Sequence, residues 1–231
     1  MAPFTSAEWR LIRRLGTPAR VQAYLNSLPY NDEPKPVGET LRSFRQVVRR
    51  RTVHCLEAAL AAAVILEAHG YPPLVLSFES IDKLEHVLFV YKMRGKWGSI
   101  GRSRDPGLHG RKPVFRTARD LAMSYFEPYV DLTGGITAYA VVDLDAEMGR
   151  YDWRLSERNV WKVEQMLIEH PHRRLPYNRA RAARWRRWYR AFKARYPDRK
   201  PVCYPGRERW TALPGEYTRP GYAVALPWPA A

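Results

Sequence analysis

Cys55 and His86 are the two residues of this chain whose types and spacing suit nucleophilic catalysis. Cys55 directly precedes an Ala- and Leu-rich run that ends at Gly70, which predicts a helix beginning near Cys55 with Thr52 as its cap. Free backbone N–H groups and the helix dipole at that position favour a thiolate. His86 opens a later strand-like segment, so the fold can bring a histidine base to the cysteine.

Each of these residues also has a structural interpretation, which the sequence leaves open. A free cysteine in an apolar helix often packs as a small hydrophobic side chain. A histidine at a strand edge is often held by hydrogen bonds and takes no part in chemistry. His54, the neighbour of Cys55, is expected to point elsewhere on the helix and is not predicted to be the base.

The segments after the Cys55 helix read as strands that could carry His86 toward it. Apolar and β-branched residues predict strands over 74–78, 86–91 and 96–101, and the last two are joined by a short connection that contains Gly95. A further strand is expected over 139–144, and a helix over 117–126 with a capping-box start at Thr117 and Asp120. The stretch 102–113 is expected to be a basic loop.

This order of helix, strand, strand, strand resembles the core of the transglutaminase-like superfamily, over roughly fifty residues of the chain. That superfamily includes transglutaminases, arylamine N-acetyltransferases, peptide N-glycanases and many bacterial cysteine proteases. The resemblance implies a thiol nucleophile at Cys55, a base at His86 and a flanking aromatic at Trp97. It therefore implies a papain-like cysteine hydrolase or acyltransferase acting on an amide or ester, such as a peptide.

The residue that orients the histidine is where the sequence departs from the superfamily. Gly101 stands where the superfamily often has an aspartate, and simple hairpin pairing places Gly101 opposite His86. Ser99 shares that face and is our candidate third catalytic residue. Asp105 is the nearest acid downstream, and a catalytic pair without a third residue is the remaining alternative.

The composition limits which compartment, membrane segments and metal sites can be predicted for this protein. Two cysteines, Cys55 and Cys203, in 231 residues make no disulfide framework, which together with the absence of a secretory signal predicts a cytoplasmic location. No segment is long and apolar enough for a transmembrane helix. The histidines lack metal-site spacing, and we predict no metal and no cofactor.

We predict an α+β fold in which a helix packs on an antiparallel sheet, with N-terminal helices before it. Residues 1–155 would form this core, and 156–231 a basic, aromatic-rich helical extension packed on it. The net charge is +16, and residues 173–200 hold ten arginines and two lysines against one acid. An alternative function is therefore a non-catalytic interaction module whose Arg173–Lys200 region binds nucleic acid or an acidic protein.

Overall fold

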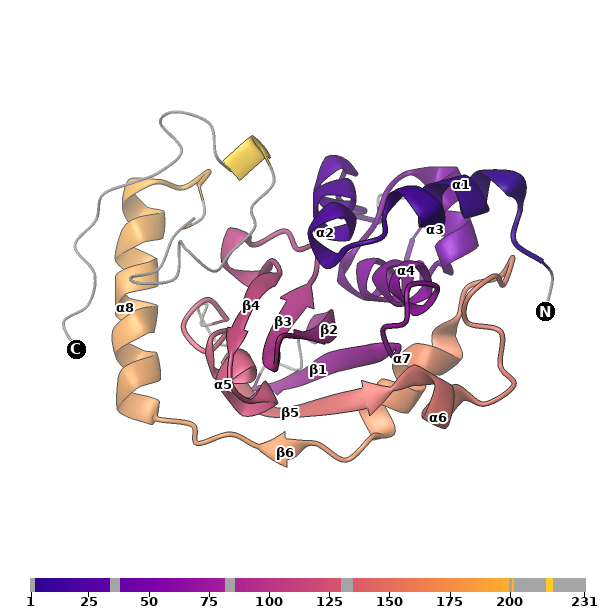
Figure 1. The fold of residues 1–231 in the computed structure, drawn as a ribbon. Helices are drawn as coiled ribbons and strands as arrows, with labels where there is room; N and C mark the ends of the chain where they lie inside the picture. The colour runs from indigo at the N-terminus through magenta and orange to yellow at the C-terminus, as the bar shows by residue number, and fades with distance from the viewer. Residues whose placement is uncertain are drawn as a thin grey trace.

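The computed structural model describes residues 3–33, 38–81, 86–129, 135–199, 201 and 215–217. Within these residues, six strands form one sheet in the order β4-β3-β2-β1-β5-β6, and every neighbouring pair is antiparallel. Helices cover both faces of the sheet, so the fold class is α+β, as predicted (Figure 1). The strands are β1 (Leu74–Ser80), β2 (His86–Met93), β3 (Lys96–Ile100), β4 (Arg111–Phe115), β5 (Ile136–Asp143) and β6 (Arg173–Arg174).

The helices begin where capping side chains satisfy the first backbone N–H groups. Thr5 and Thr17 cap the first two helices, and Thr117 with Asp120 forms the predicted capping box. Thr52 does not cap the Cys55 helix, because its N-cap is His54. The helices are α1 (Ser6–Arg14), α2 (Pro18–Ser27), α3 (Phe44–Arg50), α4 (Cys55–Glu67), α5 (Ala118–Met123), α6 (Leu144–Met148), α7 (Trp161–Glu169) and α8 (Arg179–Arg195), with 3-10 turns η1 (Pro106–Leu108) and η2 (Gly215–Tyr217).

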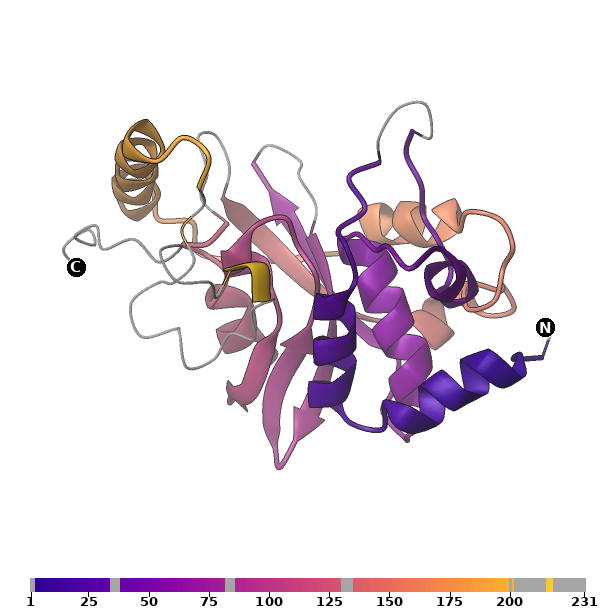
Figure 2. The ribbon, with the colours of Figure 1, turned by 90° about the horizontal axis from the view of Figure 1, so that it is seen from above.

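Alternating side chains of the sheet build two hydrophobic cores, one on each face. On β2, Val87, Phe89 and Tyr91 join the core formed with α1–α4, α6 and α7. Leu88 and Val90 join the second core, formed with α5 and α8. Seen from above, α1–α4 and α7 lie on one side of the sheet and α8 on the other (Figure 2). The start of α4 is thereby held close to the sheet.

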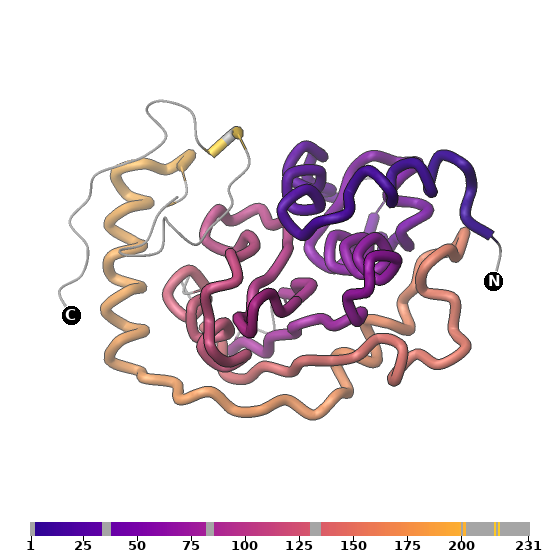
Figure 3. The backbone as a smooth tube through the Cα atoms, viewed as in Figure 1, coloured from indigo at the N-terminus to yellow at the C-terminus, as the bar shows by residue number. Residues whose placement is uncertain are grey.

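The segment after 155 is joined to both cores. α7 places Val163 and Leu167 in the same core as α4. The chain then pairs β6 with β5 and continues to α8 at the opposite end of the molecule (Figure 3). Trp185 of α8 is buried in the second core. The strongly basic helix α8 thus packs one face, with Ala182 and Trp185, into this core. Lys200 and Cys203 lie outside the described residues.

The end of the predicted basic loop 102–113 differs in the structure. Residues 111–113 belong to β4 (Arg111–Phe115), which pairs with β3 through Trp97–Phe115 and Ser99–Arg111. This strand contains Pro113 and lies at the edge of the sheet, where a missing N–H is tolerated.

No helix in the described part of the chain is long and apolar enough to cross a membrane.

Candidate active site

Cys55 is the first residue of α4 and is partly exposed, although every residue from Leu56 to Leu66 behind it is buried. The thiol lies at a helix start, where backbone N–H groups have no partner within the helix. It also lines a cavity of about 570 Å³ that opens to the surface. A small molecule or a chain segment can therefore reach a cysteine held by an otherwise buried helix.

The start of α4 is fixed by the buried carboxylate of Glu57. Its oxygens accept hydrogen bonds from the backbone N–H of His54 at 3.0 Å, the backbone N–H of Arg42 at 3.0 Å and the hydroxyl of Thr40 at 3.1 Å. One buried acid thus ties the segment around residues 40–42 to the helix start. Glu57 lies in the first turn of α4, two residues after Cys55. Its hydrogen bonds therefore also fix the position of Cys55.

His86 is the first residue of β2 and is buried, with 3% of its surface exposed. Its Nε2 lies 2.8 Å from the carbonyl oxygen of Leu108. A carbonyl oxygen can only accept, so Nε2 carries the proton and donates it to this bond. The other ring nitrogen, Nδ1, is consequently the atom left for the thiol of Cys55, with which the imidazole forms a hydrogen bond.

The pKa of the Cys55 thiol lies well below its usual range. Burial raises this pKa, but hydrogen bonds and favourable charge interactions with His54 and His86 lower it by more. Two imidazole groups therefore stabilise the thiolate, in addition to the helix start. The thiolate is the nucleophilic form of cysteine, so this environment is the one a cysteine nucleophile needs.

The expectation that His54 points away from the thiol is wrong. Its side chain hydrogen-bonds Cys55, while its Nε2 lies 2.9 Å from the carbonyl oxygen of Thr40 and 3.5 Å from Glu57. Burial lowers the pKa of His54, but the hydrogen bond to Cys55 and the charge of Glu57 raise it to about 9. His54 is thus a cationic partner of the thiolate near neutral pH. Sequence reasoning missed this role because His54 lies at the N-cap and not within the helix.

Ser99 does not orient His86, which corrects our prediction of a third catalytic residue. Its hydroxyl accepts a hydrogen bond from the backbone N–H of Arg111 at 2.9 Å and lies 2.7 Å from the hydroxyl of Tyr125. The Tyr125 hydroxyl donates to the carbonyl of His109 at 3.0 Å, so Ser99 donates to Tyr125. The hydroxyl is therefore fully used in joining β3 to β4 and to the turn that follows α5.

Gly101 is not opposite His86 either, because the register of the hairpin differs from the simple pairing. The β2–β3 ladder pairs Phe89 with Ile100, and Gly101 packs against Leu88. A Cβ atom at Gly101 would lie 2.1 Å from Leu88 Cδ2, so an aspartate there would force the buried Leu88 side chain to move. Asp105 does not take the position either, since Nε2 of His86 is already bonded to Leu108.

The Leu108 carbonyl is held in place by the turn around it. The buried guanidinium of Arg111 donates to the carbonyl of Gly107 at 2.6 Å and to that of His109 at 2.7 Å, on either side of Leu108. His109 donates from Nε2 to the Ser103 carbonyl at 3.0 Å. Burial and the nearby charges of Arg102, His86 and Arg111 lower the pKa of His109 to about 3, so it is neutral. A backbone acceptor on a braced turn thus replaces the acidic side chain.

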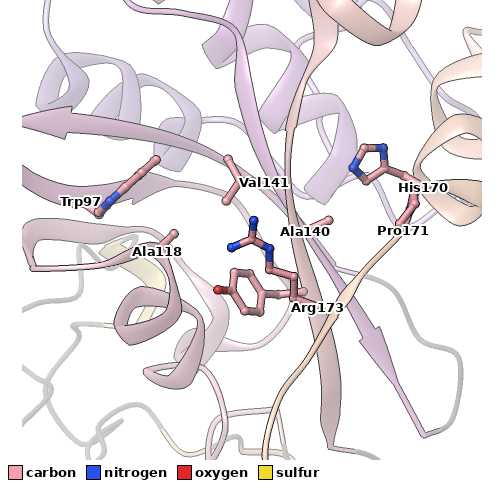
Figure 4. A pocket seen from close by; sticks show the side chains of 8 residues that line it. Trp97, Ala118, Ala140, Val141, His170, Pro171 and Arg173 are labelled. Carbon is pink, nitrogen blue, oxygen red and sulfur yellow. The ribbon is translucent and has the colours of Figure 1, made fainter.

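A second cavity, of about 430 Å³, lies elsewhere on the molecule (Figure 4). Trp97 and Ala118 line one side of it, and the side chain of Arg173 reaches into it toward Val141. Among the described residues, its lining contains no cysteine, serine or acid. Trp97, the aromatic that the resemblance placed beside the site, lines this cavity and not the one at Cys55. The described lining of the second cavity therefore offers neither a thiol nor a serine hydroxyl as a nucleophile.

No group of three or more histidine, cysteine or acidic side chains within the described ranges is arranged to hold a metal ion. In comparisons with known proteins, no family model matches the chain and no curated protein matches it. The interpretation of the site therefore depends on its own geometry.

Proposed function

We propose that this protein is a cysteine acyl-transfer enzyme of the transglutaminase-like kind, which attacks an amide or ester through Cys55 with His86 as base. The observation that carries this proposal is the thiol at the start of α4. It is partly exposed to a cavity and hydrogen-bonded to a histidine whose other nitrogen is fixed by Leu108. A buried structural cysteine requires none of these features.

The reaction follows from which atoms carry protons. The Cys55 thiolate attacks the substrate carbonyl carbon and forms a carbon–sulfur bond, while charge develops on the carbonyl oxygen. The free backbone N–H of Cys55 at the helix start is placed to stabilise that charge. His86, protonated at Nδ1, gives this proton to the leaving amine or alcohol as the carbon–nitrogen or carbon–oxygen bond breaks.

The second half of the reaction returns the enzyme to its starting state. Nδ1 of His86 removes a proton from an incoming water or amine, which attacks the thioester carbonyl. The carbon–sulfur bond then breaks and Cys55 leaves as the thiolate. Water as acceptor gives an amidase or peptidase, and an amine gives a transferase. His54 keeps its charge throughout and stabilises the thiolate in both halves.

The proposal is tested by trapping the thioester. The protein is mixed with p-nitrophenyl acetate, quenched in acid, and its mass and modified residue are read by mass spectrometry. We expect an acetyl group on Cys55, lost on adding hydroxylamine and absent in Cys55→Ala. Persistent release of nitrophenol by a folded Cys55→Ala protein at the wild-type rate would contradict the proposal.

The polyanion-binding alternative for Arg173–Lys200 stays a prediction. In the described part of this region, Arg181 forms an ion pair with the buried Glu127, and Arg186 donates to the hydroxyl of Tyr177 at 2.7 Å. These two arginines anchor α8. Arg187 and Arg195 remain exposed. Titration of the folded Cys55→Ala variant with single-stranded nucleic acid at several salt concentrations would test this alternative directly.

A further inference from the structure

The cavity at Cys55 carries negative charge on a protein whose overall charge is strongly positive. Four of the described residues that line it are acidic, and two others, Arg104 and the protonated His54, are cationic. Arg104 is exposed and lies over the ring of Tyr30, 6.0 Å from its centre. The acidic lining residues are Asp32, Glu33, Glu39 and Glu164.

Among the acidic residues that line the cavity, Glu164 is the one best suited to bind a cation. It lies in the first turn of α7 and is partly buried, and its carboxylate makes no hydrogen bond or ion pair with another described residue. Burial raises its pKa, which the charges of Glu39 and Glu33 raise further, whereas His54 lowers it. Glu33 differs, because its carboxylate accepts from the backbone N–H of Thr40 at 2.7 Å. Burying a carboxylate without a partner is unfavourable, so a cation placed there would be bound.

The same face of α7 offers apolar surface on both sides of this carboxylate. Trp161 and Ile168 lie three residues before and four residues after Glu164, which places the three side chains on one face of the helix. All three line the cavity, and both apolar side chains are exposed, Trp161 at 41% and Ile168 at 56%. This arrangement suits an alkyl chain that ends in a positive charge.

We propose that the cavity selects acyl substrates bearing an ammonium or guanidinium group, with Glu164 binding the cation and Trp161 and Ile168 contacting its alkyl chain. This substrate class rests on the proposed function. A metal ion is a poorer occupant, because no group of three metal-binding side chains is found in the described part of the chain. A lysine or arginine side chain next to the scissile carbonyl has the required chemistry.

Charged thiol reagents test the electrostatic part without requiring turnover. In a Cys203→Ser background, Cys55 is modified with methanethiosulfonates that carry a trimethylammonium, a sulfonate or only a methyl group. Each rate is divided by that of free cysteine with the same reagent. We expect the cationic reagent to be favoured over the anionic one by about tenfold at low salt, and by less at about 0.5 M salt, where Debye screening is strong.

Two variants on one helix localise the effect. Glu164→Gln is expected to lower the cation preference by about threefold or more, the change expected from removing one nearby charge. Glu169→Gln is the matched control, since Glu169 is exposed at the end of α7 and bonds Gln165 at 3.0 Å. Glu39→Gln serves as a second test, because Glu39 is exposed and its substitution leaves the folded core intact. Equal rates for the two charged reagents, or equal losses in the Glu164 and Glu169 variants, would overturn the proposal.

Ester hydrolysis separates this inference from the proposed function. The nitrophenyl esters of N-acetyl-lysine, N-acetyl-norleucine and N-acetyl-glutamate are compared as substrates, and the lysine ester should have the highest kcat/KM. A cation preference in labelling with no ester turned over would contradict the enzyme function alone. Turnover with equal kcat/KM for the lysine and norleucine esters would contradict the substrate class alone.

Discussion

The imidazole Nε2 of His86 lies 2.8 Å from the carbonyl oxygen of Leu108, and this one bond determines which nitrogen can act as base. Because the carbonyl accepts, Nδ1 is the unprotonated nitrogen of the neutral ring. A carbonyl carries a partial charge only, so it stabilises imidazolium less than a carboxylate would. A second imidazole, that of His54, also lies beside Cys55 and adds to the stabilisation of the thiolate.

Replacing His54 should raise the pKa of Cys55 without removing the base. In His54→Gln the thiolate loses a cationic neighbour whose own pKa is about 9, while His86 keeps its bond to Leu108. We expect the midpoint of the pH dependence of Cys55 alkylation by iodoacetamide to move upward by about one pH unit, which corresponds to about 1.4 kcal/mol of lost interaction with the thiolate. His172→Gln, a change away from the cavity, is the control. Unchanged alkylation in His54→Gln would exclude a role for His54 in activating the thiol.

Ser99 should matter for stability and not for the thiol. Ser99→Ala removes the acceptor of the buried Arg111 N–H and the donor to Tyr125, and leaving such groups unsatisfied costs about 1–3 kcal/mol each. We therefore expect a lower free energy of unfolding in urea, with a Cys55 alkylation rate within about twofold of wild type, a difference of under 1 kcal/mol. A stable variant whose thiol reacts much more slowly would restore Ser99 as the orienting residue.

Placing an aspartate at Gly101, where the superfamily that the sequence resembles often has one, should harm the protein. The new Cβ atom would lie 2.1 Å from Leu88 Cδ2, and overpacking of this kind costs about 1–3 kcal/mol or more. Gly101→Asp and Gly101→Ala should both unfold at lower urea concentration than wild type, and Gly101→Asp should not speed alkylation of Cys55. A Gly101→Asp protein of wild-type stability with a faster thiol would show that the site accepts the acid.

His109 should make the fold sensitive to acid. Its pKa is about 3 in the folded protein and near 6.5 when unfolded, so between these values the unfolded chain binds the extra proton. The neutral ring therefore contributes stability above pH 6.5 that is lost as the pH falls toward 3. We expect wild-type stability to fall more steeply than that of His109→Gln between pH 6.5 and 4, by about 1 kcal/mol per pH unit.

Unfolding in urea at each half pH unit measures this difference. The groups facing His109 are Arg102, Arg111 and His86, and all three are kept in the variant. Their contributions therefore cancel in the comparison. Parallel stability curves for the two proteins would show that His109 has the same pKa in the folded and unfolded states, which would contradict its lowered pKa.

The helix start at Cys55 and the strand that His86 begins could be predicted because each has a local signal. An Ala- and Leu-rich run marks α4, and an apolar, β-branched run followed by a short turn that contains Gly95 marks β2 and β3. The Leu108 carbonyl could not be predicted, since every residue has a backbone carbonyl. The role of Ser99 was predicted wrongly because the register of β3 and the presence of β4 decide what its hydroxyl meets.

Which residues line the cavity could not be predicted from the sequence either. Glu39 precedes α3, Cys55 begins α4 and Glu164 lies in α7, more than a hundred residues later. Only the packing of α7 in the same core as α4 brings these groups together. The helical spacing of Trp161, Glu164 and Ile168 was visible in the chain, but which way that face points depends on tertiary structure.

The Cys55–His86 pair is tested most sharply by the pH dependence of Cys55 alkylation by iodoacetamide in the folded protein, with modified sites read by mass spectrometry. We predict rapid labelling of Cys55 with a midpoint well below the pH of about 8.5 at which an ordinary cysteine titrates, moved upward in His86→Gln. A Cys55 that stays unlabelled until the protein unfolds, or a profile identical in His86→Gln, would contradict the pairing of this thiol with this histidine.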